Sequence, residues 1–233
     1  MIIHTTTFLS GFEFPWDMSL IPEYFPVFYK PALMTLQITT FGILMGLILG
    51  LFAALLRISK FKILSAPARA YIWAIRGTPL LLQLLFIYFG LVNVVDIPRI
   101  PAAIIALGIH NGAYIAEIFR GSILAVDRGQ REAAYSLGMT PWLAMKRIIL
   151  PQAFKRSVPP LGNQFIIALK DSSLASAASV PELLLQARQL GSSTFSYMEM
   201  LFIAGIYYLI MTTALTFMVG RLEKRLSISD HRV

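Results

Sequence analysis

The sequence predicts an all-α integral membrane protein with about five transmembrane helices. Of its 233 residues, 57% are hydrophobic and only 14% are charged, whereas soluble domains carry roughly 25% charged residues. Several stretches approach the ~20 apolar residues that cross a bilayer as a helix. The chain has no cysteine, which excludes disulfides and thiolate metal sites. We expect one compact membrane domain without a signal peptide.

Five segments are predicted to span the membrane. They are residues 33–56, 66–94, 102–125, 159–178 and 198–219. The second and fourth are less regular than the others because each contains charge or proline, and proline interrupts helical hydrogen bonding. We therefore divide the chain into an N-terminal segment (1–30), a membrane domain (31–225) and a short tail (226–233).

The N-terminal segment mixes aromatic residues with proline and acidic residues. Aromatic rings favour the headgroup zone of a bilayer, so this segment is predicted to lie at the membrane interface. Its aromatic residues include Trp16, Tyr24, Phe25, Phe28 and Tyr29.

Three glycines in the first span recur every four residues, at Gly42, Gly46 and Gly50. Small residues at this spacing let two helices approach closely. The pattern predicts a packing face, either within the subunit or between two subunits.

The distribution of Lys and Arg sets the predicted orientation. Fifteen of the 20 basic residues follow the first, third or fifth span, and cytoplasmic loops carry such an excess. We therefore expect the N-terminus outside and the C-terminus inside. The net charge of +8 is explained by this topology, so we expect no nucleic-acid partner.

The loop at about residues 126–157 is predicted to fold. Residues 130–137 favour a short helix, and Gly138 suits the position after its end because glycine tolerates positive φ. Thr140 and Pro141 are typical of the start of a second helix, which we expect Pro151 to end. The residues alone leave two alternatives, a rigid cytoplasmic protrusion and an amphipathic hairpin resting on lipid headgroups.

Four ionisable residues fall within the predicted spans, namely Arg76, Glu117, Lys170 and Asp171. A charge at mid-bilayer costs roughly 2.5–3.5 kcal/mol on insertion scales, so it usually faces protein or water. Arg76 is a candidate clamp for a substrate carboxylate, since guanidinium groups bind carboxylates bidentately. Asp171 is a candidate acceptor for an ammonium group, or else Lys170 and Asp171 pair with other spans. For Glu117 we favour an ion pair with Arg120, three residues on.

Neutral polar residues extend the candidate list. Asn111 and Asn163 either line a cavity or join helices by hydrogen bonds, and Gln83 has the same two alternatives. His110 stands without a second histidine or carboxylate at ligand spacing, so we predict that it packs or hydrogen-bonds between helices. No metal site and no catalytic residues are predicted.

Several ordered segments resemble one known family, the permease subunits of ABC importers. Glu132-Ala133-Ala134, Gly138, Ile148, Leu150 and Pro151 are similar to that family's cytoplasmic-loop motif. Further segments are similar to its polar amino acid uptake branch. They are Arg76-Gly77-Thr78-Pro79, Ala113 to Gly121, Gly129-Gln130, Leu150 to Ala153, Asn163 and Leu169 to Leu174.

The resemblance implies the type I importer permease fold and a mechanism. Glu132, Ala133, Ala134 and Gly138 would form a coupling helix that docks on a cytoplasmic ABC ATPase. Arg76, Asn111, Asn163, Lys170 and Asp171 would bind the amino acid, of the histidine, arginine, glutamine or cystine type. The other implied partners are a second permease subunit, identical or homologous, an extracytoplasmic solute-binding protein and membrane lipid.

The same resemblance implies residence in the bacterial inner membrane, with no enzymatic activity in this chain. No Gly-rich loop ending in Gly-Lys-Ser/Thr is present, so ATP and Mg²⁺ are expected on the separate ATPase. Two other classes remain as alternatives to test: an ion-coupled carrier working alone, in which Asp171 and Glu117 relay protons, and a membrane anchor or receptor component.

Overall fold

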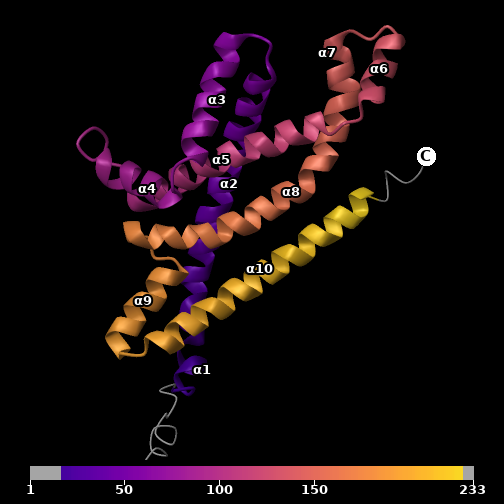
Figure 1. Ribbon diagram of the computed structural model, residues 1–233. Coiled ribbons are helices and arrows are strands. Elements are labelled where there is room, and N and C mark those ends of the chain that lie inside the picture. The colour runs from indigo at the N-terminus through magenta and orange to yellow at the C-terminus, as the bar shows by residue number, and fades with distance from the viewer. Residues whose placement is uncertain (1–16, 228–233) are drawn as a thin grey trace, which may run out of the picture.

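The computed structural model describes residues 17–227, and every regular element in that range is helical (Figure 1). This confirms the predicted all-α class. In chain order the main helices are α1 (Leu20–Tyr24), α2 (Tyr29–Ile58), α3 (Lys62–Arg76), α4 (Leu80–Leu85), α5 (Arg99–Leu124), α6 (Arg128–Ser136), α7 (Pro141–Ala144), α8 (Leu150–Asp171), α9 (Leu183–Thr194) and α10 (Tyr197–Ser227).

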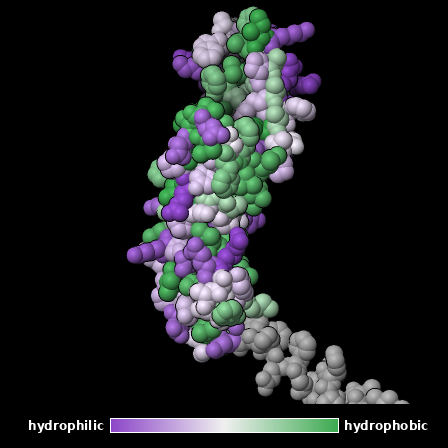
Figure 2. Space-filling model, turned by 90° about the vertical axis from the view of Figure 1, so that its left-hand side faces the viewer, coloured by the Kyte–Doolittle hydropathy of each residue, from purple (hydrophilic) through white to green (hydrophobic). Residues whose placement is uncertain are grey.

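The α6–α7 hairpin and the N-terminal helix lie at opposite ends of the molecule (Figure 1). The hairpin of α6 and α7 projects from one end, and α1 and α9 lie toward the other (Figure 1). Helices α8 and α10 run side by side between these ends. On the face seen in Figure 2, hydrophobic residues occupy much of the middle, as expected for a surface in contact with lipid.

Fewer helices qualify as membrane spans by length and apolarity than the sequence predicts. Among the described residues three stretches qualify, Leu20–Ile58, Arg99–Leu124 and Tyr197–Leu226. Helices α3 and α4 qualify together as one bent pair. The predicted fourth span, 159–178, covers the second half of α8 and the 3-10 helix Ser172–Ala178 that follows it. Helix α8 is 22 residues long but carries several polar side chains.

The second predicted span is two helices joined by a sharp bend. Helices α3 and α4 meet at 105°, across Gly77, Thr78 and Pro79. Proline lacks the N–H that would continue the helix and disfavours helical conformation in the residue before it. Pro79 thus accounts for the interruption of this predicted span, and the structure adds the size of the bend.

The glycines of α2 pack against α5 within the subunit. A Cβ added at Gly50 would lie 2.8 Å from the carbonyl oxygen of Gly112, and one at Gly46 would lie 3.3 Å from that of Gly108. Only a residue without a side chain allows the two backbones to approach so closely. Of the two alternatives for this spacing, the structure selects packing inside the subunit.

The described part of the N-terminal segment packs on α10. Phe28 is fully buried, and the ring of Phe25 stacks on that of Tyr207 with centroids 4.7 Å apart. The hydroxyl of Tyr207 donates a hydrogen bond to the Phe25 carbonyl. Tyr29 is exposed, as an interfacial residue would be, whereas Trp16 lies outside the described residues.

One predicted helix end is wrong. Pro151 does not terminate the second helix of the 126–157 loop, because a π-helical turn at Met145–Ile149 separates α7 from α8. Helix α8 follows directly from Leu150, and Pro151 lies in its first turn. The hairpin is consequently continuous with α8.

Candidate functional site

The α6–α7 hairpin is held by local capping at each turn. The Asp127 carboxylate accepts a hydrogen bond from the Gly129 N–H at 2.7 Å and caps α6. At the other end Gly138 has φ of 75°, and the Met139 N–H donates to the Ala134 carbonyl at 3.1 Å. These are the features of a glycine-ended helix cap. Thr140 then caps α7, so the turn has one defined geometry.

The base of the hairpin is fixed to the two helices that carry it. The guanidinium of Arg156 on α8 donates to the Ala125 carbonyl at the end of α5. A small apolar cluster lies beneath, formed by Ile123, Val126, Ile149 and Ala153. The hairpin is therefore a rigid extension of α5 and α8, which favours the protruding alternative over one lying on lipid.

The predicted coupling residues do not all face outward. Glu132, Ala133 and Gly138 are exposed, but Ala134 is only 3% exposed and packs inside the hairpin. Ala134 therefore stabilises the hairpin and is not available for contact with another protein.

Two large apolar side chains that sequence reasoning missed dominate the exposed tip. Leu137 is 80% exposed and Trp142 is 71% exposed. They flank the Gly138 turn in the sequence, and Glu132 on the same hairpin is exposed as well. Large apolar residues at the tip of a rigid hairpin are typical anchors of a protein interface. Their positions on either side of the predicted Gly138 turn follow from the sequence, whereas their exposure does not.

A second group of polar residues surrounds the bend between α3 and α4. The guanidinium of Arg76 lies 5.1 Å from the centroid of the Tyr114 ring of α5, a cation–π distance. The Tyr114 ring in turn contacts His110, with centroids 5.1 Å apart. Arg76 itself remains exposed, and it lines a cavity of about 470 Å³ together with Arg57 and Arg69.

Gln83 of α4 connects the bend to α5. Its amide nitrogen donates to the carbonyls of Ile75 and Thr78, at 2.9 and 3.1 Å, on the two sides of the break. Its amide oxygen lies 3.1 Å from His110 Nδ1. This confirms the interhelical hydrogen bond predicted for His110. Gln83 thus stabilises the bend, one of the two roles left open for it.

Asn111 joins two helices and does not line a cavity within the subunit. It is fully buried. Its amide oxygen accepts a hydrogen bond from Gln164 of α8 at 2.8 Å, and its amide nitrogen donates to the Leu107 carbonyl at 2.8 Å. With both groups bonded inside the protein, Asn111 takes the interhelical role of its two alternatives, and its contact with a substrate stays a prediction.

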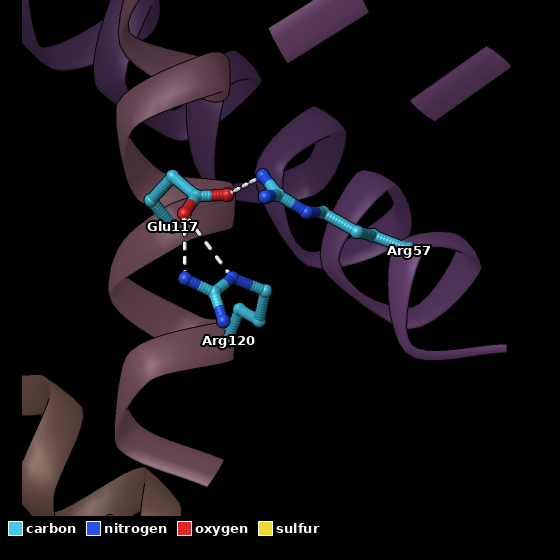
Figure 3. A network of polar contacts seen from close by, with 3 residues as sticks. All are labelled: Arg57, Glu117 and Arg120. Carbon is cyan, nitrogen blue, oxygen red and sulfur yellow. Dashed lines mark hydrogen bonds and ion pairs between the residues drawn. The ribbon is translucent and has the colours of Figure 1, made fainter. Parts of the chain in front are cut away.

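Glu117 forms the predicted ion pair and a further one. Its carboxylate binds the Arg120 guanidinium at 2.9 Å, as the spacing of three residues predicted. It also binds Arg57 of α2, which approaches from the other side (Figure 3). The side chain is about four-fifths buried. Both oxygens are occupied, so the structure gives no support to a proton-relay role for Glu117.

The remaining candidates lie along the second half of α8. Lys170 and Asn163 are exposed, and Asp171 is half-buried at the last residue of the helix. The segment that follows, Ser172–Ala178, packs against α4 beyond the bend. The structure thus leaves Arg76, Asn163, Lys170 and Asp171 available to solvent or to a partner, but records no direct contact that brings Arg76 to the other three.

Comparison with known proteins identifies the chain's relatives. Residues 46–228 match the family described as binding-protein-dependent transport system inner membrane component. The chain belongs to this family. The glutamine transport system permease protein GlnP of Escherichia coli K12 is 40% identical over 216 residues, which cover 91% of this chain and 99% of GlnP. The L-cystine transport system permease protein TcyB of Bacillus subtilis is 40% identical over 219 residues, which cover 93% of each chain.

Solved structures agree with the family assignment. An amino acid ABC transporter crystallised with histidines contains a chain that superposes with a TM-score of 0.87 at 42% identity, covering 90% of this chain and 99% of that one. The methionine transporter MetNI superposes with a TM-score of 0.68 at 22% identity, covering 85% and 93%, and supports the shared fold. The chain is therefore an ABC permease of an inner membrane, and the ion-coupled carrier is overturned.

The buried carboxylate of Glu182 in this ABC permease was missed entirely. It is fully buried and caps α9, accepting hydrogen bonds from the N–H groups of Leu184 and Leu185 at 2.8 and 2.7 Å. The Tyr208 hydroxyl of α10 donates to it as well, at 3.0 Å. Glu182 thereby joins α9 to α10. An acidic residue is favoured at the start of a helix, and this is the signal by which the sequence could have located it.

Proposed function

We propose that this chain is the transmembrane permease subunit of an ATP-driven ABC importer that moves a polar amino acid into the cell. The observation that carries the proposal is the rigid α6–α7 hairpin, with its exposed tip and its fixed base. Relatives named for glutamine and cystine transport support an amino acid as substrate. So does the structural neighbour described as an amino acid transporter.

The hairpin would transmit force from a separate ABC ATPase. Glu132 and Ala133 present a narrow exposed face, and Leu137 and Trp142 present apolar anchors beside it. Because the base is bonded to both α5 and α8, a displacement of the tip moves the membrane helices with it. The chain contains no phosphate-binding Gly-Lys-Ser/Thr loop, so ATP and Mg²⁺ are assigned to the ATPase.

We place the hairpin and the C-terminus in the cytoplasm and the N-terminus outside. Basic residues concentrate on the hairpin and at the end of α10, as the positive-inside rule requires. A solute-binding protein would then contact the opposite end, near α1 and α9. A second permease subunit, identical or homologous, would complete the membrane part. The surface between the ends meets lipid, and no nucleic-acid partner is proposed.

For substrate contacts we retain Arg76, Asn111, Asn163, Lys170 and Asp171. Arg76 is exposed beside a cavity and next to a broken helix, and its guanidinium suits an α-carboxylate. Asp171 and Lys170 carry charges that suit the ammonium group or a charged side chain. Broken helices at mid-membrane are where transporters commonly bind substrate, which supports the placement at the α3–α4 bend.

Uptake into vesicles tests the proposal. The permease is reconstituted with its ATPase and binding protein, and radiolabelled glutamine, arginine, histidine and cystine are offered in turn. We expect uptake of at least one of these amino acids. The uptake should require ATP on the side of the membrane that carries the ATPase, and it should be lost when a non-hydrolysable ATP analogue replaces ATP. Uptake driven by a proton or sodium gradient without ATP contradicts the proposal.

A further inference from the structure

An apolar groove lies between α8 and α10, on the half of the molecule nearest the C-terminus. Its volume is about 560 Å³, within the ~300–1,000 Å³ range of small-ligand sites. Side chains of α8 and α10 form its walls, and Ile43, Leu47 and Ile115 form its floor. The two walls approach closely at Gly162, where an added Cβ would lie 2.5 Å from Val219.

The chemistry of the groove is asymmetric along its length. Two of its described lining residues are charged, Arg221 and Arg225, and both lie toward the C-terminal end of α10. The other lining residues are apolar. The Arg221 guanidinium lies 4.2 Å from the centroid of the Phe217 ring, which holds it near the groove's rim. A ligand that fits this lining has one anionic end and one long apolar end.

The length of the groove matches one leaflet. From Leu215 to Arg225, α10 advances ten residues, or about 15 Å at 1.5 Å per residue. The hydrocarbon core of a bilayer is about 30 Å thick, so one leaflet contributes about half of that. The arginines thus stand at headgroup depth while Leu215 lies near the depth at which acyl chains end.

We propose that this groove binds an anionic phospholipid of the cytoplasmic leaflet. Its phosphate would lie on Arg221 and Arg225, and one acyl chain would run along α10 toward Leu215. Anionic lipids gather at basic residues on the cytoplasmic side of membrane proteins, with about 1 kcal/mol for each Lys or Arg. The inference rests on the orientation proposed above and not on the identity of the amino acid.

A bound lipid would fill the space between α8 and α10, where packing between the helices is incomplete. Helix α8 is continuous with the hairpin, so the helix that would move with the ATPase forms one wall of the groove. The lipid would therefore support α8 on the side that faces α10. We therefore expect the lipid to affect the stability of the permease and the coupling of the hairpin to the membrane helices, and not the recognition of the substrate.

Native mass spectrometry of the assembled, delipidated importer tests the proposal. The probes are phosphatidylglycerol and phosphatidylcholine with identical oleoyl chains, and glycerol 3-phosphate as the anion without a chain. We expect phosphatidylglycerol to be retained preferentially and glycerol 3-phosphate not to bind. Arg221→Gln and Arg225→Gln should each weaken phosphatidylglycerol binding about fivefold, while Arg188→Gln on the exposed face of α9 should leave it unchanged.

A second variant tests the apolar half of the groove. Leu215→Trp should fill the groove and reduce binding of both lipids, whereas Ala214→Trp, at an exposed neighbour outside the lining, should not. Equal binding of the two lipids, or arginine variants that bind phosphatidylglycerol normally, overturns the proposal. If Leu215→Trp instead separates the two permease subunits, the groove holds a second copy and the lipid assignment is wrong. ATP-driven uptake, measured in parallel, reports separately on the proposed function.

Discussion

Glu117 of α5 binds Arg57 of α2 in an ion pair between residues 60 positions apart (Figure 3). The pair lies at the α2–α5 contact, where the α2 glycines allow the two backbones to approach closely. Arg120 binds the second carboxylate oxygen of Glu117 at 2.9 Å. Close backbone packing and a largely buried carboxylate thus fasten α2 to α5, the helix that leads into the hairpin.

Removing the Glu117 charge should loosen this contact. Glu117→Gln is expected to lower the free energy of unfolding by about 2 kcal/mol, because two arginines lose a partly buried charged acceptor. A melting curve of the purified protein in detergent measures the effect. Arg120→Gln, which removes only the neighbour three residues away, should cost less, about 0.5 kcal/mol.

A double mutant identifies the interhelical pair as the cause. If Arg57 and Glu117 interact, the loss in Glu117→Gln/Arg57→Gln should be smaller than the sum of the two single losses. Additive losses would show that the two side chains stabilise the protein independently.

Steric substitution at Gly50 tests the α2–α5 contact. Gly50→Ala places a Cβ 2.7 Å from the Ile115 side chain and 2.8 Å from the Gly112 carbonyl, and overpacking of this kind costs about 1–3 kcal/mol. The melting temperature should fall. Gly205→Ala is the matched control, because no atom lies within 4 Å of its added Cβ. Equal effects of the two changes would contradict close packing at Gly50.

The hairpin tip should determine ATPase binding. Trp142→Ser is expected to weaken binding of the ATPase by about 2 kcal/mol or more, the usual cost of losing an aromatic anchor at an interface. Co-purification of the ATPase with the permease measures the effect. Its effect on folding should be small because the side chain is 71% exposed. Trp73→Ser provides the control, since Trp73 is 80% exposed on α3, away from the hairpin.

Glu132→Lys should reduce ATPase-coupled transport in the same way, through reversal of an exposed charge. Normal transport in both Trp142→Ser and Glu132→Lys, at normal expression, would remove the hairpin from the coupling mechanism. A variant that fails to insert is recognised by its absence from the membrane fraction.

Features that depend on neighbouring residues were predictable from the sequence. The glycine spacing in α2, the Glu117–Arg120 pair and the break before Pro79 each arise within one or two helical turns. The cap at Gly138 belongs to the same class. The prediction that a helix ends at Pro151 was wrong. A π-helical turn precedes this proline and shifts the hydrogen-bond register, and the helix continues beyond it.

Features that depend on two distant segments were not predictable. The Arg57–Glu117 pair and the Asn111–Gln164 bond join helices whose relative rotation one sequence does not set. The same holds for Ala134, whose burial depends on α7 folding back over α6. Asn111 illustrates the consequence, since an amide in a span suits a cavity and a helix contact equally well until its partner is known.

Arg76 provides the sharpest test of the proposed substrate path. It lies at the end of α3 beside the bend, exposed, with its guanidinium over the Tyr114 ring. If it holds the α-carboxylate, Arg76→Ala should abolish or strongly reduce uptake of every transported amino acid, because all share that group. Arg69→Ala is the matched control, since Arg69 is exposed about two turns earlier on α3 and lines the same cavity. Loss of uptake of a single amino acid would instead place Arg76 near the substrate side chain, and unaltered uptake of all of them would remove it from the path.

Arg76→Lys separates the charge of this side chain from its geometry. An ammonium group cannot form the bidentate pair with a carboxylate, so Arg76→Lys should retain part of the uptake only if the positive charge alone suffices. The ring of Tyr114, which contacts both Arg76 and His110, is unchanged in this variant.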